Sequence, residues 1–284
     1  MNAVEKLFSG SSVVFFDGAM GTMLQQSGMP KDLRGDIMNI AMPDVVKAIH
    51  ERYIDAGSDI ICTNTFGASA GTLRDSGYTP EQVISAGIRL AKSGAEGRAL
   101  VAFDMGPIGE LLEPSGDLTF GDAYKMFKEQ AELAEKHVAD LVLVETMGDI
   151  EEVRAAVGAV RENTTLPVFA TMTFLENMKT YMGTTVKELA ELAGEYRVEG
   201  VGINCSLPPD KMFRVACALS EATDIPLIVK LNAGMPGTDG SYALTPEQFA
   251  QNMLPYRELN VKVVGACCGS TPDFIRELRR MFLL

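Results

Sequence analysis

The sequence predicts an α/β protein with the (β/α)8 barrel fold, formed as a single domain over residues 1–284. Two observations indicate this fold. Eight short runs of apolar and β-branched residues are spaced along the chain, and each precedes a longer amphipathic stretch rich in Ala, Glu, Leu and Lys. Strand and helix patterns that alternate eight times within this length are typical of a closed parallel barrel, in which the chemistry lies where strands end.

The expected strands are the eight apolar runs, whose lengths suit buried strands. They are Val13–Phe16, Ile60–Thr63, Leu100–Phe103, Leu141–Val144, Val168–Met172, Gly200–Ile203, Leu227–Val229 and Val261–Val264. Helices are expected after residues that favour a first helical turn, because Thr and Asp side chains accept free backbone N–H groups there and Pro needs none. These helix starts are at Pro43, Thr79, Thr119 or Asp122, Thr184-Thr185, Pro208, Thr245 and Thr271.

An open doubly wound sheet is the rival architecture. It would place a G-x-G-x-x-G turn after the first strand. This chain instead has Asp17-Gly18-Ala19-Met20-Gly21-Thr22, with its two glycines three residues apart. The barrel is therefore favoured, and its long loops at 29–39, 105–117 and 233–242 are candidates for function.

Composition excludes several classes of partner. Formal net charge is -13, and no cluster of Lys and Arg is longer than Arg279-Arg280, which argues against nucleic acid and anionic membranes. Residues 1–10 lack the features of a signal peptide, and no apolar run reaches the roughly 18 residues of a membrane span. Five cysteines, an odd number in a long chain, indicate reduced thiols. We therefore expect a soluble, cytoplasmic protein.

Polar side chains stand at the expected end of almost every strand and should ring one mouth of the barrel. For any one of them, a role in a turn or a helix cap is the simpler interpretation. The ring comprises Asp17 with Gly18, Asn64 with Thr65, Asp104, Glu145 with Thr146, Thr171 with Thr173, Asn204 with Cys205, Asn232, and Cys267 with Cys268.

Three cysteines of this ring predict a zinc site. Cys267 and Cys268 follow the last strand, and Cys205 follows the sixth. Zinc prefers thiolates at about 2.3 Å in a tetrahedron, and three protein ligands leave a position open for catalysis. An iron–sulfur cluster would want four cysteines, and a disulfide between adjacent residues would be strained. Cys62 and Cys217 fit the role of small hydrophobes in a strand and a helix.

The other polar groups of the ring suggest an amino-acid substrate that carries sulfur. The glycine turn that begins at Asp17 offers backbone N–H groups to a carboxylate. Glu145 could accept an ammonium group, although pairing with a cation of the protein is the alternative for this residue. His50 and His137 fall within helices, so we interpret both as packing or surface residues.

The motifs Asp17-Gly18-Ala19-Met20-Gly21-Thr22, Glu145-Thr146-Met147, Asn204-Cys205-Ser206, Asn232-Ala233-Gly234 and Gly265-Ala266-Cys267-Cys268-Gly269 resemble the homocysteine S-methyltransferase family. The likeness runs from about Val14 to Ile275 and is greatest for the N-terminal homocysteine-binding barrel of cobalamin-dependent methionine synthases.

The resemblance implies that Cys205, Cys267 and Cys268 hold Zn²⁺ and that the sulfur of homocysteine binds the metal. It also implies that Asp17, Gly18, Ala19 and Thr65 hold the polar end of the amino acid and that Glu145 binds its amino group. The asparagines Asn64, Asn204 and Asn232 are further candidates.

The methyl donor follows less directly from the resemblance. A separate methyl-corrinoid protein is the expected donor, with homocysteine as acceptor and methionine as product. The alternatives are a small sulfonium donor such as S-methylmethionine, or a non-catalytic barrel that binds zinc or thiols. One departure from the family pattern matters, because Lys230-Leu231 stands where Gln-Pro is expected before Asn-Ala-Gly. Lys230 puts a cation near the mouth and leaves open whether another thiol is the acceptor.

Overall fold

The computed structural model describes residues 3–10, 13–238 and 240–284, so five residues of the expected domain, among them Asp239 of a long loop, lie outside the described residues. Its eight strands are β1 (Val14–Phe15), β2 (Ile60–Cys62), β3 (Leu100–Met105), β4 (Leu141–Met147), β5 (Val168–Met172), β6 (Gly200–Cys205), β7 (Leu227–Leu231) and β8 (Val261–Ala266). All are parallel and pair in the order β1-β8-β7-β6-β5-β4-β3-β2.

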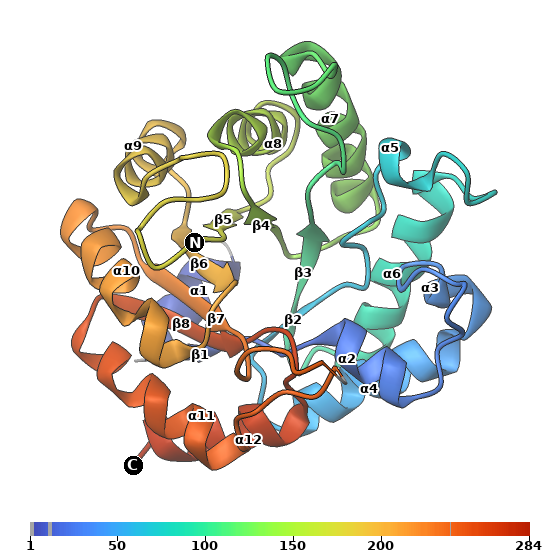
Figure 1. Cartoon of the computed structure of the whole chain (residues 1–284). Coiled ribbons are helices and arrows are strands. Elements are labelled where there is room, and N and C mark those ends of the chain that lie inside the picture. Colours follow the sequence, from blue (N-terminus) through green and yellow to red (C-terminus); the bar gives the residue numbers. More distant parts are fainter. Residues whose placement is uncertain (1–2, 11–12, 239) are drawn as a thin grey trace.

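The sheet closes on itself between β1 and β2. A parallel bridge joins Phe16 to Ile60, and the Asp17 N–H donates to the Ile60 carbonyl at 3.1 Å. The strands form an inner ring with most of the helices outside it (Figure 1). The predicted (β/α)8 barrel is therefore confirmed.

The helices are α1 (Ala3–Gly10), α2 (Met20–Gln26), α3 (Met38–Ala41), α4 (Pro43–Asp55), α5 (Ala70–Leu73), α6 (Pro80–Ala95), α7 (Phe120–Lys136), α8 (Ile150–Asn163), α9 (Val186–Tyr196), α10 (Pro209–Ala222), α11 (Pro246–Met253), the 3-10 helix η1 (Leu254–Glu258) and α12 (Pro272–Phe282). Thr79, Thr119, Thr185 and Thr245 cap α6, α7, α9 and α11 with their hydroxyls, as their sequence positions predict. In the described part of the chain, no helix has the length and apolarity to cross a membrane.

Six of the helices in the described residues lie outside the expected helix starts, namely α1, α2, α3, α5, α8 and η1. Asp149 caps α8 by accepting the Glu151 N–H at 3.0 Å. Helix α1 covers the barrel interior, since Val4 is fully buried among Val14 and Phe16 and the Phe8 ring stacks on Phe169 with centroids 5.8 Å apart.

Five strands extend beyond their expected ends. β3, β4, β6, β7 and β8 continue to Met105, Met147, Cys205, Leu231 and Ala266, so Asp104, Glu145 and Asn204 belong to strands and do not follow them. This corrects the predicted boundaries. In β3, β4 and β6, apolar patterning ends earlier because these last residues carry polar side chains, but backbone pairing continues beneath them.

Two apolar cores result from strand alternation. The larger lies between the sheet and the helices, and the smaller fills the barrel with residues such as Val14, Ile60, Leu143 and Ile228. Two residues further along their strands, the inward positions become polar at Asp104, Glu145 and Lys230. The apolar layer thus forms the base on which a polar layer rests.

Candidate metal and substrate site

A cavity of about 480 Å³ opens at the carboxyl ends of the strands. Its lining includes the glycine turn at Gly18 and Ala19, the acidic residues Asp104 and Glu145, and all three cysteines of the predicted zinc site. Its volume suits a small molecule. The barrel therefore brings the thiols to one enclosure with Gly18, Ala19 and Glu145 of the predicted substrate-binding residues, whereas Asp17 and Thr65 are buried and do not line it.

The thiols of Cys205, Cys267 and Cys268 lie close enough to share one metal ion. All three sulfurs lie within 4.8 Å of one another, and the Cys205 and Cys268 sulfurs are 3.7 Å apart. Ligands of a regular tetrahedron with bonds of about 2.3 Å are about 3.8 Å apart. The donor set and its spacing fit zinc with three protein ligands.

The backbone around these thiols adopts conformations that most residues avoid. Cys205 and Ser206 have φ of 57° and 60°, in the left-handed region. Beyond the adjacent pair, Gly269 has φ 83°, and a Cβ built there would lie 2.1 Å from the Tyr242 ring. A side chain at 269 would therefore clash with Tyr242, which packs directly against the turn.

The three thiols differ in acidity because they hydrogen-bond to one another. Hydrogen bonds from Cys205 and then Cys267 lower the pKa of the Cys268 thiol to about 3. The contacts with Cys205 and Cys268 raise the pKa of Cys267. Cys268 is thus the thiol that ionises first, and thiolates are the form that binds metal.

The glycine turn is braced from behind. The Ala19 N–H donates to Ser270 Oγ at 3.0 Å, and the Tyr53 hydroxyl donates to the Ala19 carbonyl at 3.2 Å. A Cβ at Gly18 would lie 2.4 Å from Ser270 Oγ, so only glycine fits without displacing that hydroxyl. Asp17 is buried, and its Oδ2 accepts the Cys62 N–H at 2.8 Å.

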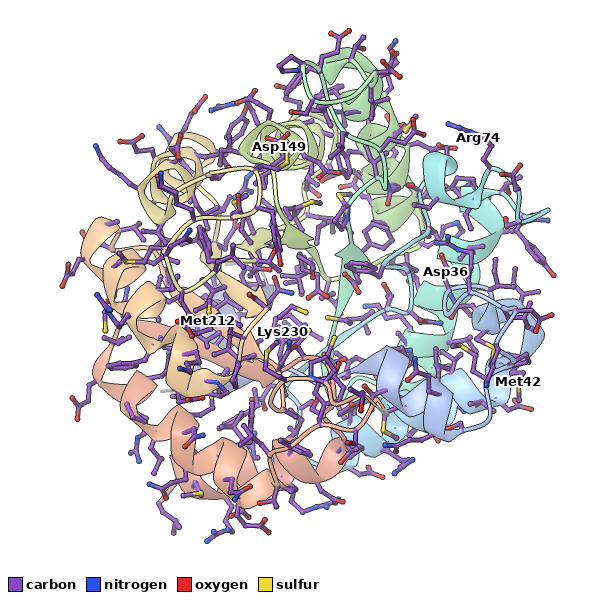
Figure 2. All side chains as sticks on the ribbon, in the orientation of Figure 1. Asp36, Met42, Arg74, Asp149, Met212 and Lys230 are labelled. Atoms are coloured by element: carbon purple, nitrogen blue, oxygen red, sulfur yellow. The ribbon has the colours of Figure 1, made fainter. Side chains whose placement is uncertain are left out.

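Glu145 is paired with a cation of the protein. Lys230 Nζ lies 3.1 Å from Glu145 Oε2, 3.2 Å from the Cys62 sulfur and 3.9 Å from Asp17 Oδ1. Figure 2 shows Lys230 in the middle of the ring of strands. Cys62 is buried in β2 as expected for a small hydrophobe, but it also lines the cavity and contacts this cation.

Asn204 joins three strands beneath the cavity. Its Oδ1 accepts the Thr146 N–H at 2.9 Å and the Thr171 hydroxyl at 2.8 Å, and its Nδ2 donates to Thr146 Oγ1 at 2.7 Å. Thr146 has φ 63°, at a shift of register between β4 and β5. Asn204 is fully buried and therefore positions the residue that follows Glu145.

The remaining candidates, Thr65, Asn64 and Asn232, are buried, and of these three Asn64 alone lines the cavity. Thr65 is fully buried, and its hydroxyl contacts Thr63 Oγ1 at 2.6 Å and donates to the Asp104 carbonyl at 2.8 Å. Asn64 lines the cavity and donates to the Gly35 carbonyl at 2.6 Å. Asn232 donates to the Ser206 carbonyl at 2.8 Å, while its buried Oδ1 has no partner. The roles of these residues in binding stay predictions.

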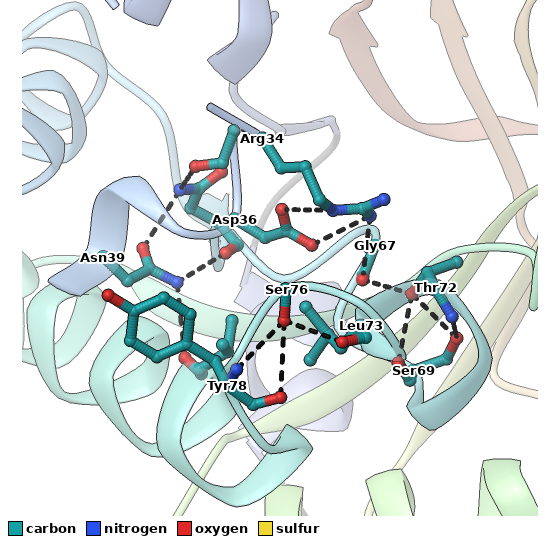
Figure 3. A network of polar contacts seen from close by, with 12 residues as sticks. Arg34, Asp36, Asn39, Gly67, Ser69, Thr72, Leu73, Ser76 and Tyr78 are labelled. Carbon is teal, nitrogen blue, oxygen red and sulfur yellow. Dashed lines mark hydrogen bonds and ion pairs between the residues drawn. The ribbon is translucent and has the colours of Figure 1, made fainter. Parts of the chain in front are cut away.

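One wall of the cavity is the long loop at 29–39. Arg34 and Asp36 both line the cavity, and their side chains pair with 3.2 Å contacts. Arg34 also donates to the Gly67 carbonyl at 3.1 Å, which ties this loop to the one after β2 (Figure 3). Phe66, beside that contact, lines the cavity and is 43% exposed.

Sequence reasoning missed part of this arrangement. It did not pair Lys230 with Glu145, and it gave Asp104 and Arg34 no role in binding, although the polar strand ends and the long loops were signals for them. The two histidines were interpreted correctly as packing or surface residues. His50 is fully buried in α4, and His137 Nε2 lies 3.1 Å from Glu81 Oε1.

The chain is similar to known proteins in sequence and in fold. The chain is 32% identical over 289 aligned residues to the methionine synthases of Mycobacterium leprae and Mycobacterium tuberculosis, and the match covers 94% of this chain. It spans about a quarter (24%) of the length of those relatives. The fold matches the crystal structure of the homocysteine methyltransferase MmuM from Escherichia coli, metallated form, with a TM-score of 0.86 at 20% identity, over 98% of this chain and 99% of that one.

A family model assigns the chain more directly. The model described as homocysteine S-methyltransferase matches residues 14–282, which include every strand of the barrel and all three clustered cysteines. This range agrees with the motifs from Asp17 to Gly269 that carry the resemblance in the sequence. The chain therefore belongs to the homocysteine S-methyltransferase family.

Proposed function

We propose that this protein is a zinc-dependent homocysteine S-methyltransferase that acts in the cytoplasm, where reducing conditions keep its thiols free. The observation that carries the proposal is the cluster of Cys205, Cys267 and Cys268 in the wall of a cavity that is also lined by Glu145, with the buried Asp17 beside it. The three thiols would hold Zn²⁺ and leave one position for a substrate sulfur. When bound, zinc favours ionisation of a thiol that coordinates it.

The chain's own residues orient the acceptor. Asp17 and Glu145 supply negative charge for an ammonium group, and the turn at Gly18 and Ala19 approaches the substrate closely because it has little side-chain bulk. The cavity walls restrict the motion of a bound thiol, which lowers the entropic part of the barrier to attack on a methyl group. In the reaction, a sulfur–carbon bond forms as the bond between methyl and donor breaks, and the thiol proton is lost to solvent beforehand.

A methyl-corrinoid protein is the donor that we favour. Large apolar side chains are exposed on loops that leave the carboxyl ends of β2, β3, β5 and β7, around the same end of the barrel as the cavity; they are Phe66, Leu111, Tyr181, Met182 and Met235. Exposed apolar surface of this kind suits a protein partner better than a small sulfonium ion. S-methylmethionine as donor is the second candidate, because the cavity of about 480 Å³ has the size of a small-molecule site and would admit a small sulfonium ion.

Metal and product measurements test the proposal. We expect the purified protein to bind about one zinc ion, and Cys267→Ser to lose it together with formation of methionine from homocysteine. Cys217→Ser is the matched control, since Cys217 is a half-buried cysteine of α10 outside the cluster. Methyl-corrinoid protein and S-methylmethionine are supplied in parallel. Turnover in metal-free protein would contradict the zinc site, and zinc binding without turnover by either donor would favour the non-catalytic barrel.

A further inference from the structure

Four buried charged residues form the floor of the cavity; Asp104, Glu145 and Lys230 line it, and Asp17 lies next to Lys230 without lining it. They carry more negative charge than their resident cation can compensate. Asp17, Asp104 and Glu145 are each less than 10% exposed, and the cation within this group is Lys230, itself 3% exposed. Lys230 Nζ makes its closest carboxylate contact with Glu145, at 3.1 Å. If all four groups are ionised, two negative charges remain without a cation, and buried charges are costly when unpaired.

Two carboxylate oxygens of this floor have no hydrogen-bond partner. Asp17 Oδ1 and Asp104 Oδ1 are buried and unpartnered, and Asp17 Oδ1 lies 3.9 Å from Lys230 Nζ, beyond hydrogen-bond distance. Burial raises the pKa of Asp17 to about 6, and burial together with Glu145 raises the pKa of Asp104. Asp17 Oδ1 and Asp104 Oδ1 are thus hydrogen-bond acceptors that receive no hydrogen bond from the described residues.

Lys230 is held in this place by the fold. Its side chain points into the barrel, as the alternation from Ile228 requires, and its Nζ lies 4.5 Å from the centroid of the Phe16 ring. A Cβ at Gly265 would lie 3.1 Å from Lys230 Cγ, so glycine at that position leaves room for the lysine stem. Neighbouring Cys62 and the carboxylates keep the pKa of Lys230 above its ordinary value despite burial. The lysine is therefore a permanent partner of Glu145.

We propose that Asp104 is a specificity-determining residue, whose carboxylate in the cavity lining receives the ammonium group of an amino-acid thiol, while Asp17 adds its buried negative charge and Lys230 occupies Glu145. The proposal rests on the proposed function and assigns its acceptor subsite. Glu145 then acts on the substrate through the charge of the cluster and through whichever oxygen Lys230 leaves free. An acceptor that lacks an ammonium group would leave both aspartate oxygens buried without a partner.

The test compares two thiols that differ only in the amino group: homocysteine and 4-mercaptobutanoate. Binding to zinc-loaded protein is measured by calorimetry at constant pH. We expect wild type to bind homocysteine more tightly, and Asp104→Asn to weaken homocysteine by about 10- to 100-fold, the range for loss of a charge-assisted hydrogen bond, with 4-mercaptobutanoate changed less than about 3-fold. Zinc content should equal that of wild type.

Glu152→Gln is the matched control. Glu152 is also a buried carboxylate, but its Oε1 accepts the Ile108 N–H and it does not line the cavity. Its variant should keep the preference for homocysteine. If Asp104→Asn weakens both thiols equally, or neither, the assignment is refuted. If wild type binds both thiols equally in a zinc-dependent manner, the ammonium subsite is refuted while the metal site stands. Failure to bind any thiol would contradict the proposed function itself.

Discussion

Replacement of Asn204 by alanine should destabilise the protein and disturb the cavity together. The substitution removes three hydrogen bonds, two to Thr146 and one to Thr171, from a fully buried position. Each such bond contributes about 1 kcal/mol net, so the loss is roughly 3 kcal/mol before any cavity term. For a chain of this length that corresponds to a fall in melting temperature of about 5 °C.

The same substitution frees a strained residue. The backbone of Thr146 has φ 63°, a conformation that costs a non-glycine residue about 1–2 kcal/mol. The Asn204 side chain stabilises it with two hydrogen bonds, one to the Thr146 N–H and one to its hydroxyl. Without them, Thr146 should relax toward an ordinary conformation and carry the adjacent Glu145 with it. We therefore expect weaker homocysteine binding in Asn204→Ala in addition to lower stability.

Thermal unfolding of metal-free protein at one pH is the assay, because zinc at Cys205 would add its own stabilisation. Thr171→Val is the matched control, since it removes one of the three bonds with little change in volume and should cost about 1 kcal/mol. If the alanine variant melts within 2 °C of wild type, or no lower than Thr171→Val, the view that Asn204 braces Thr146 is wrong.

Three further predictions concern packing, pH and the cavity wall. Gly265→Ala should lower the free energy of unfolding by about 1–3 kcal/mol, because its Cβ would lie 2.8 Å from Phe16 Cβ. Gly194→Ala, where a Cβ meets nothing within 4 Å, is the control in the same melting assay. Equal effects of the two substitutions would contradict the close packing at Gly265. Burial lowers the pKa of His50 to about 4, so the unfolded chain binds the proton first, and stability present above about pH 6.5 is lost as pH falls toward 4. His50→Leu should therefore gain about 2 kcal/mol relative to wild type between pH 7.5 and 5 in urea unfolding, and a pH-independent difference would refute this. Arg34→Gln should speed amide exchange in residues 29–39 and 66–68, and unchanged rates there would show that the contact with Gly67 does not hold the loop.

The fold could be predicted because the strands have a distinct sequence pattern. Runs such as Leu141–Val144 and Val168–Met172 are apolar on both faces, which is the pattern of a strand covered by helices and filled from inside. The ends of β3 and β6 escaped prediction because polar side chains there face a cavity, where burial does not require apolarity. Helix α1 escaped because it is short and lies before the first strand.

The thiol cluster could be predicted because few residue types bind zinc. Cysteines at the ends of two strands were therefore enough to suggest a shared metal ion. The pairing of Glu145 with Lys230 could not be predicted in the same way. These residues are 85 positions apart, and Lys230 and Cys62 are 168 apart. Only closure of the barrel brings β2, β4 and β7 around one point, and many acidic residues of this chain were equally available to a lysine in the sequence.

The two halves of the cavity would select their acceptor by independent physical effects. The sulfur atoms of Cys205, Cys267 and Cys268 favour a metal ion that would bind the thiol of the acceptor. The aspartate oxygens favour the ammonium group of the acceptor. An amine without sulfur would gain only the ion pair, and a thiol without an amine would leave buried carboxylates uncompensated. Because the two losses involve separate groups, their binding free energies should add. The ratios by which the site prefers an amino-acid thiol over each incomplete ligand should therefore multiply. Lys230 contributes to this selection, since it pairs with Glu145 and leaves two carboxylates uncompensated, of which one ammonium group of the acceptor would neutralise one.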